Sequence, residues 1–147
     1  MKKIIFIILL LTVTGCSKKQ TVCTTSTIIN SSIVRSSYII SHNNNIVYKL
    51  EKKEQIINKN TDTLNKFKAS IENNNREYNK MSLYKNKVII KDDTLISITK
   101  INYRRLDLNK YVTIDKENKN IVSDNKVKLD KLLKQYKKLG LQCSNIK

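Results

Sequence analysis

The sequence predicts an α+β domain built on a four-stranded, mainly antiparallel sheet with two helices on one face, in the order ββαββα. Two pairs of segments rich in β-branched and aromatic residues are each joined by a polar turn. An apolar stripe with helical spacing follows each pair. The chain has 147 residues, which is enough for one modest core.

The first hairpin is expected over residues 33–40 and 46–50, with the asparagines at 43–45 as its turn. Asn60 or Thr61 then caps a helix whose stripe is interrupted by the poor helix formers at 73–75. The stripe consists of Leu64, Phe67, Ile71, Tyr78 and Met81.

The second hairpin is expected over residues 87–91 and 94–103, around a turn at Asp92 and Asp93. Residues 106–123 form a connection with one helical turn near 107–111. Ser123 or Asp124 caps the last helix, and Gly140 ends it in a left-handed conformation. The apolar stripe of this helix consists of Leu129, Leu132, Leu133, Tyr136 and Leu139.

The N-terminus has the features of an export signal. A positive start is followed by an apolar run at 4–11, which is too short to span a membrane permanently. Val13, Thr14 and Gly15 stand directly before Cys16, as in a bacterial lipobox. We therefore expect a signal peptide at 1–15, a lipidated cysteine with a short tether at 16–22 and a single domain at 23–147. The alternative is an ordinary cleaved signal with a chance cysteine.

In bacterial lipoproteins with such a motif, a diacylglyceryl group is attached to the cysteine sulfur before cleavage. Val13, Thr14 and Gly15 would be the peptidase recognition residues, and Cys16 the lipidated residue. Two acyl chains give stable membrane binding, whereas one gives only marginal binding. The expected location is the extracytoplasmic face of the cell membrane, with the lipid on Cys16 as the only attached group and no other cofactor.

The two other cysteines, Cys23 and Cys143, lie near the two ends of the mature domain. An even number of cysteines in an exported protein predicts a disulfide between them. The alternatives are two free thiols, or a metal pair completed by His42.

The chain is strongly basic, with a formal net charge of +17. Only four of the 29 basic residues are arginine, so the charge indicates a diffuse field and not a specific phosphate or base-reading site. Codon bias in an AT-rich genome explains the lysine content equally well. If the charge is functional, anionic lipid or wall polymer would be contacted by Lys18, Lys19, Lys131, Lys134 and Lys138; the alternative is that these lysines are only solvated.

Several of these features together resemble the YehR-like small bacterial lipoproteins. They are Cys23 at the start of the domain, the first hairpin, the segment Thr99-Lys100-Ile101-Asn102-Tyr103-Arg104-Arg105-Leu106-Asp107-Leu108 and the closing cysteine after a terminal helix. The resemblance implies an α+β domain without an assigned biochemical function.

No catalytic pattern is visible in the sequence. His42 has no spaced partner and is expected to be a solvated turn residue, and Asp92 and Asp93 to be hairpin-turn residues. Tyr38, Tyr48, Tyr78 and Tyr103 are expected to pack in the core or sheet. No metal ligand set is found, and export together with scarce arginine argues against nucleic acid as a partner.

The expected function is therefore a non-enzymatic binding or structural role for a lipid-anchored, monomeric envelope protein. An accessory subunit docking on a membrane protein complex is the first alternative, and a small envelope enzyme is the second.

Overall fold

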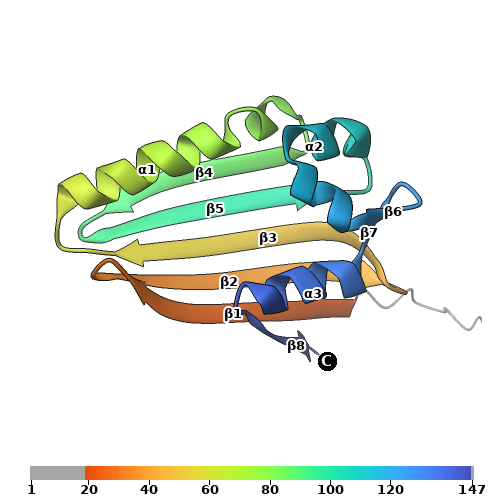
Figure 1. Cartoon of the computed structure of the whole chain (residues 1–147), viewed down its shortest axis with the longest axis horizontal. Coiled ribbons are helices and arrows are strands. Elements are labelled where there is room, and N and C mark those ends of the chain that lie inside the picture. The colour runs from red at the N-terminus through yellow and green to blue at the C-terminus, as the bar shows by residue number, and fades with distance from the viewer. Residues whose placement is uncertain (1–18, 147) are drawn as a thin grey trace, which may run out of the picture.

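The computed structural model describes residues 19–146, which form one antiparallel sheet of eight strands and three α-helices. The fold is α+β, but the expected four strands and two helices are wrong (Figure 1). The sequence prediction missed four strands, β1, β6, β7 and β8, because these strands are short, rich in polar residues, or both. Their partners lie elsewhere in the chain, and strand preference depends on such pairing.

Six of the strands follow the order β4-β5-β3-β2-β1-β8 across the sheet. The short strand β7 adds to the first two residues of β3, and β6 pairs with β7. The strand bounds are β1 Lys19–Ile29, β2 Ser32–Asn43, β3 Ile46–Ile57, β4 Tyr84–Lys91, β5 Thr94–Asn102, β6 Val122–Ser123, β7 Lys126–Lys128 and β8 Gln142–Ile146.

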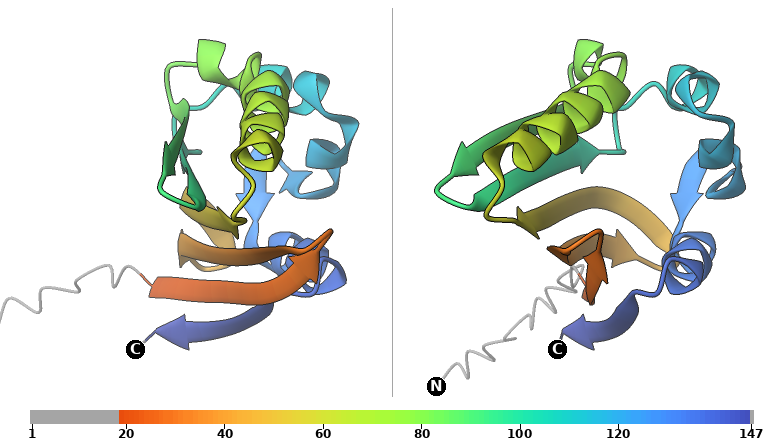
Figure 2. Two further views of the ribbon diagram at one scale, coloured as in Figure 1. Left: turned by 90° about the vertical axis from the view of Figure 1, so that its left-hand side faces the viewer. Right: turned by 60° about the vertical axis from the view of Figure 1, so that its left-hand side comes forward.

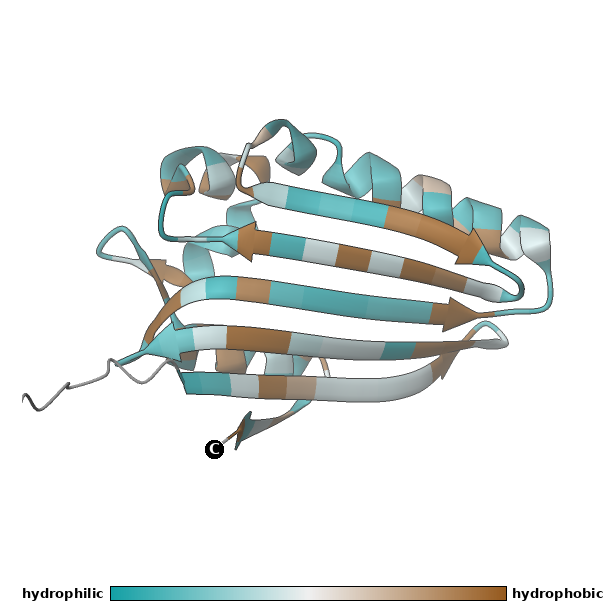
Figure 3. Cartoon of the chain, turned by 180° about the vertical axis from the view of Figure 1, so that it is seen from behind, coloured by the Kyte–Doolittle hydropathy of each residue, from teal (hydrophilic) through white to brown (hydrophobic). Residues whose placement is uncertain are grey.

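The helices are α1 Thr61–Asn75, α2 Leu108–Ile114 and α3 Leu129–Lys138, with short 3-10 segments η1 Tyr78–Lys80 and η2 Lys116–Asn120. They cover one face of the sheet, with α1 along β4 and β5 and α3 along β1 and β2 (Figure 1). The strands are unobstructed from the opposite side, which we call the open face (Figure 3). Figure 2 shows how the twisted sheet curves around the region enclosed by the helices.

Strand β1 shows why the polar segment at 19–27 was not recognised. It pairs along its whole length with β2, from Lys19 opposite His42 to Ile29 opposite Ser32. Its other side pairs with β8, where Cys23 stands opposite Cys143 and forms a disulfide with it. Pairing on both sides and a buried Cys23 stabilise this threonine-rich strand without an apolar alternation.

Two apolar clusters fill the space between sheet and helices. Below α1, Leu64 packs with Ile56, Val88 and Leu95. The larger cluster lies below α2 and α3 and includes Leu50, Ile101, Leu132, Val127, Tyr111 and Tyr136.

The structure confirms one predicted helix cap and contradicts another. The Asn60 side chain accepts a hydrogen bond from the Thr63 amide at 3.0 Å, as the predicted cap requires. The predicted cap of the last helix is wrong, because α3 begins at Leu129 and Asp124 lies in the β6–β7 turn with a positive φ of 53°. No helix among residues 19–146 is long and apolar enough to cross a membrane.

Candidate functional site

One end of the sheet lies next to the predicted lipid attachment. Strand β1 begins at Lys19, only three residues after Cys16. Three extended residues span about 10 Å, so this end, called the anchored end below, would stay close to a membrane that holds Cys16. Val13, Thr14, Gly15, Cys16 and Lys18 themselves lie outside the described residues.

The anchored end contains a buried polar network that corrects the prediction for His42. This histidine is 6% exposed and is not a solvated turn residue. Its Nε2 lies 3.0 Å from Oγ1 of Thr21, and the Thr21 hydroxyl donates to Oδ1 of Asn145 at 2.7 Å. Because that hydroxyl has one proton, Nε2 of His42 is the donor toward Thr21. The network joins β2, β1 and β8 beside the disulfide.

The three lysines predicted on the last helix are brought together by the structure. Lys131, Lys134 and Lys138 are exposed along one side of α3 and line a hollow of about 370 Å³ with Asn120 and Gln135. Lys19 is also exposed, but it lies at the start of β1 and does not line this hollow.

A second group of lysines, which the sequence analysis missed, lies on the open face of the sheet. Adjacent strands place five exposed lysines around a single glutamate, Glu51, and we call this group the lysine patch. Strand alternation is the signal that could have identified it, because the residues recur at every second position of β3 and β4. The lysines are Lys49, Lys53, Lys85, Lys87 and Lys100.

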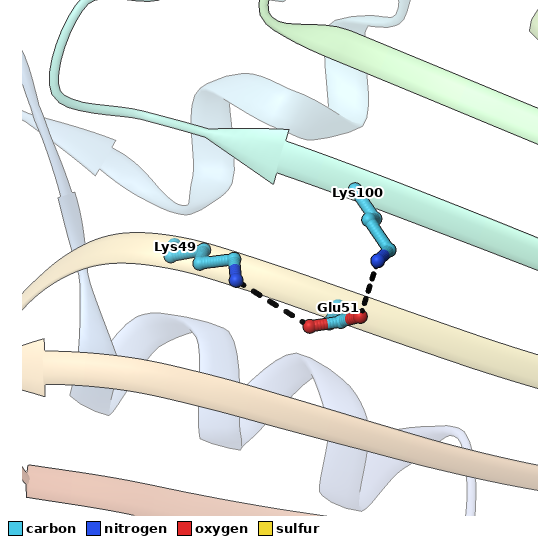
Figure 4. Close-up of polar contacts among 3 residues, drawn as sticks. All are labelled: Lys49, Glu51 and Lys100. Atoms are coloured by element: carbon cyan, nitrogen blue, oxygen red, sulfur yellow. Dashed lines mark ion pairs between the residues drawn. The ribbon is translucent and has the colours of Figure 1, made fainter.

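Glu51 holds two of these lysines in place. Its carboxylate lies 3.0 Å from Nζ of Lys100 and 3.5 Å from Nζ of Lys49 (Figure 4). The hydrogen bond from Lys100 is the main reason that the pKa of Glu51 lies below its ordinary value. Lys53, Lys85 and Lys87 form no ion pair with any other residue between 19 and 146, so their charges are available to another molecule.

The lysine patch runs from the anchored end to the middle of the open face, where Lys53 and Lys87 lie in the same row as Thr24. Lys49 of β3 pairs with Ser41 of β2, which in turn pairs with Gln20 of β1. Two strand spacings therefore separate the Cα atoms of Lys49 and Gln20, a distance of about 10 Å.

Farther from the anchored end, the exposed residues of the same face include Ile28, Ile33 and Ile89 and two more basic residues, Arg35 and Lys91. Basic residues therefore occur along the whole length of this face, and the lysine patch is their densest group.

The covered face carries a cluster of tyrosines. The rings of Tyr78 and Tyr84 are stacked with their centres 4.8 Å apart, and Tyr111 packs against Tyr78 at 5.6 Å. Tyr38 and Tyr136 meet edge to face at 5.0 Å. Burial raises the pKa of Tyr111 to about 12 and, as the main cause, raises those of the other four.

The predictions for individual tyrosines have different outcomes. Tyr38 and Tyr103 are core residues, as expected, and Tyr78 packs against that core. Tyr48 instead lies beneath the guanidinium of Arg104, 4.5 Å from its ring centre. Asp92 and Asp93 connect β4 to β5 and are exposed, as expected for turn residues.

The described part of the chain, residues 19–146, has no cluster of three or more histidine, cysteine, aspartate or glutamate side chains arranged to hold a metal ion. The groups that remain as candidates for function are the lysines and the tyrosine-rich interior. Both suit binding by charge and by ring contacts.

No protein-family model matches the chain, and no curated protein sequence matches it. Two structures solved by NMR are similar in fold. A protein from Streptococcus pneumoniae TIGR4 is 14% identical with a TM-score of 0.55, over 98% of this chain and 96% of that chain. The Escherichia coli YehR protein is 12% identical with a TM-score of 0.58, over 90% of this chain and 95% of that chain. The chain therefore has a YehR-like fold.

Proposed function

We propose that this chain is a lipid-anchored, extracytoplasmic lipoprotein of the bacterial envelope that acts by binding and not by catalysis. It is attached through Cys16 and holds its lysine patch against anionic lipid headgroups of the same membrane. Cys16 is the only lipid-bearing residue in this proposal, and the domain works as a monomer.

The observation that carries the proposal is the position of the lysine patch. Five lysines surround one glutamate on the open sheet face, between the anchored end and the middle of the sheet. A surface that is held within a few residues of a bilayer meets headgroups without further loss of translational freedom. Each basic residue at an anionic membrane surface contributes about 1 kcal/mol of attraction.

The lysines of α3 provide a matched comparison. Lys131, Lys134 and Lys138 carry the same charge as Lys53, Lys85 and Lys87, but they belong to the covered side of the sheet. Replacing either set by glutamine removes three charges from exposed positions. A difference between the two triple variants therefore reports which face meets the membrane and not the total charge.

The test measures partitioning of the mature chain with Cys16→Ser onto vesicles of phosphatidylcholine with and without phosphatidylglycerol. Neutralising Lys53, Lys85 and Lys87 removes about 3 kcal/mol of attraction, which weakens partitioning roughly 100-fold at low salt. The α3 variant should bind nearly as well as the parent chain. Equal losses in both variants, or no dependence on phosphatidylglycerol, would contradict the proposal. Binding to isolated wall polymer but not to vesicles would replace lipid by polymer as the partner.

Lipid attachment is tested in the producing cell. Mass spectrometry of the mature N-terminus should find a diacylglyceryl-modified Cys16 as the first residue, and Cys16→Ala should remain unprocessed. A mature chain that begins elsewhere, or an unmodified Cys16, would remove the anchor from the proposal.

A further inference from the structure

The covered face of the sheet contains a cavity that the membrane-contact proposal does not use. It has a volume of about 430 Å³ and lies between the sheet, the end of α1, the α2–η2 segment and α3. This volume is within the range of small-molecule sites. Its walls include Tyr78, Tyr84 and Tyr111 and the amides of Asn118 and Gln135. Two carboxylates, those of Asp115 and Glu117, also line it on the α2–η2 side.

Lys52, which also lines the cavity, interrupts the pattern of strand β3. It points to the covered side, between the core residues Leu50 and Ile56. Its Nζ lies 5.3 Å from the ring centre of Tyr38 and 5.9 Å from that of Tyr136. No carboxylate among residues 19–146 comes within ion-pair distance of this ammonium group.

A partly buried ammonium group without a counterion is costly for folding. Burial lowers the pKa of Lys52, and the charge of Glu54 only partly opposes that effect. The Glu54 carboxylate is itself engaged, because it accepts a hydrogen bond from Tyr38 at 2.6 Å. The Tyr136 hydroxyl, on the neighbouring ring, is buried and has no hydrogen-bond partner. On this side of the sheet Lys52 therefore lacks an ion-pair partner, and the Tyr136 hydroxyl lacks a hydrogen-bond partner.

The polar groups on the wall also leave capacity for a ligand. The Asn118 amide nitrogen donates to Tyr78 Oη at 2.7 Å and to the Tyr111 carbonyl at 3.0 Å, which leaves its side-chain oxygen as an open acceptor. Tyrosine faces suit the flat or apolar body of a small molecule.

We infer that this cavity binds a small organic anion, with the anionic group on Lys52, away from Asp115 and Glu117, and a ring-shaped or apolar body against the outer surface of the Tyr78, Tyr84 and Tyr111 cluster. An anion supplies the missing counterion, and the ring walls supply area for the rest of the molecule. This site is independent of the lysine patch, which lies on the opposite face.

The test uses three matched probe pairs: benzoate with benzamide, galacturonate with galactose, and phenyl phosphate with phenol. Each pair shares one ring and differs in charge. Binding is followed by amide chemical shifts of the isotope-labelled mature chain with Cys16→Ser. At least one anion should shift the signals of Asn118 and Gln135 at millimolar concentration, and its neutral counterpart should not. Failure of all three anions, or equal binding of a neutral counterpart, overturns the inference.

Lys52→Met retains most of the side-chain length and removes the charge. This variant should bind the anion about 10- to 100-fold more weakly, as expected for loss of one charge-assisted contact. Lys91→Met is the matched control, because this exposed lysine of β4 lies on the open face outside the lysine patch and should leave the shifts unchanged. Equal effects of the two variants would mean that the net charge attracts the probe and would overturn the inference.

Urea denaturation separates binding from folding. Without ligand, Lys52→Met should be at least as stable as the parent chain, since the lysine has no ion pair to lose. A clear loss of stability would assign Lys52 a structural role and overturn the assignment as a ligand group.

Discussion

The disulfide between Cys23 and Cys143 is expected to make a large contribution to stability, and Cys143→Ser tests it. The bond joins residues 120 positions apart. In the loop-entropy description, opening a loop of that length gives the unfolded chain about 5 kcal/mol of additional conformational freedom. Cys143 is the better position to change, because it is exposed whereas Cys23 is fully buried. The substitution therefore removes the bond and leaves the core packing unchanged.

The assay is urea denaturation of the parent chain, oxidised and reduced, beside Cys143→Ser and the exposed neighbour variant Ser144→Ala. The free energy of unfolding of the oxidised parent chain should exceed that of Cys143→Ser by about 3 to 5 kcal/mol, and that of the reduced parent chain should equal that of the variant. All side chains of β8 are exposed, so amide exchange in this strand should also accelerate when the bond is absent. A difference below about 1 kcal/mol, or one no larger than that of Ser144→Ala, would refute the reasoning.

Three further predictions concern single side chains. Burial lowers the pKa of His42, so the unfolded chain binds the proton more readily than the folded chain. The free energy of unfolding should therefore be highest above pH 6.5 and fall as the pH drops below that value. The urea midpoint of His42→Asn should fall less than that of the parent chain over the same pH interval. Tyr136→Phe removes a buried hydroxyl without a hydrogen-bond partner and should leave the melting temperature unchanged or higher. Tyr38→Phe breaks the 2.6 Å hydrogen bond to Glu54 and should lower the free energy of unfolding by about 1–3 kcal/mol. A larger loss of stability in Tyr136→Phe than in Tyr38→Phe would contradict these hydrogen-bond assignments. Gly140→Ala places a residue with a side chain at a φ of +81°, and no other atom lies within 4 Å of the new Cβ. Chemical denaturation should therefore show a loss of about 1–2 kcal/mol in the free energy of unfolding from backbone conformation alone. An unchanged free energy of unfolding would show that the turn relaxes.

Sequence patterns predicted the segments whose structure depends on their own residues. The hairpin around Asp92 and Asp93, the cap at Asn60 and the helical turn after Asp107 are all present. Each of these depends on a short-range preference, either a turn residue or a side chain that bonds a nearby amide. The prediction was wrong at Ser123 and Asp124, where the same residue types form a hairpin turn and not a helix cap.

The candidate sites were much less predictable. The lysine patch is assembled from three strands, so its register depends on pairings between distant segments. His42 was expected in solvent because nothing nearby in the sequence covers it, yet Thr21 and Asn145 reach it from β1 and β8. Lys52 was overlooked because a lysine on a half-exposed strand is ordinary until its facing direction is known.

Composition and local spacing were enough to establish the α+β class and the positive charge, and they predict an export signal with a lipobox. Only the tertiary structure decided that the sheet has eight strands, that β1 and β8 are joined by the disulfide and that the lysines divide between two faces. The physical reason is that strand pairing is non-local. A polar segment such as β1 becomes a strand because β2 and β8 satisfy its backbone hydrogen bonds, and no local pattern records that.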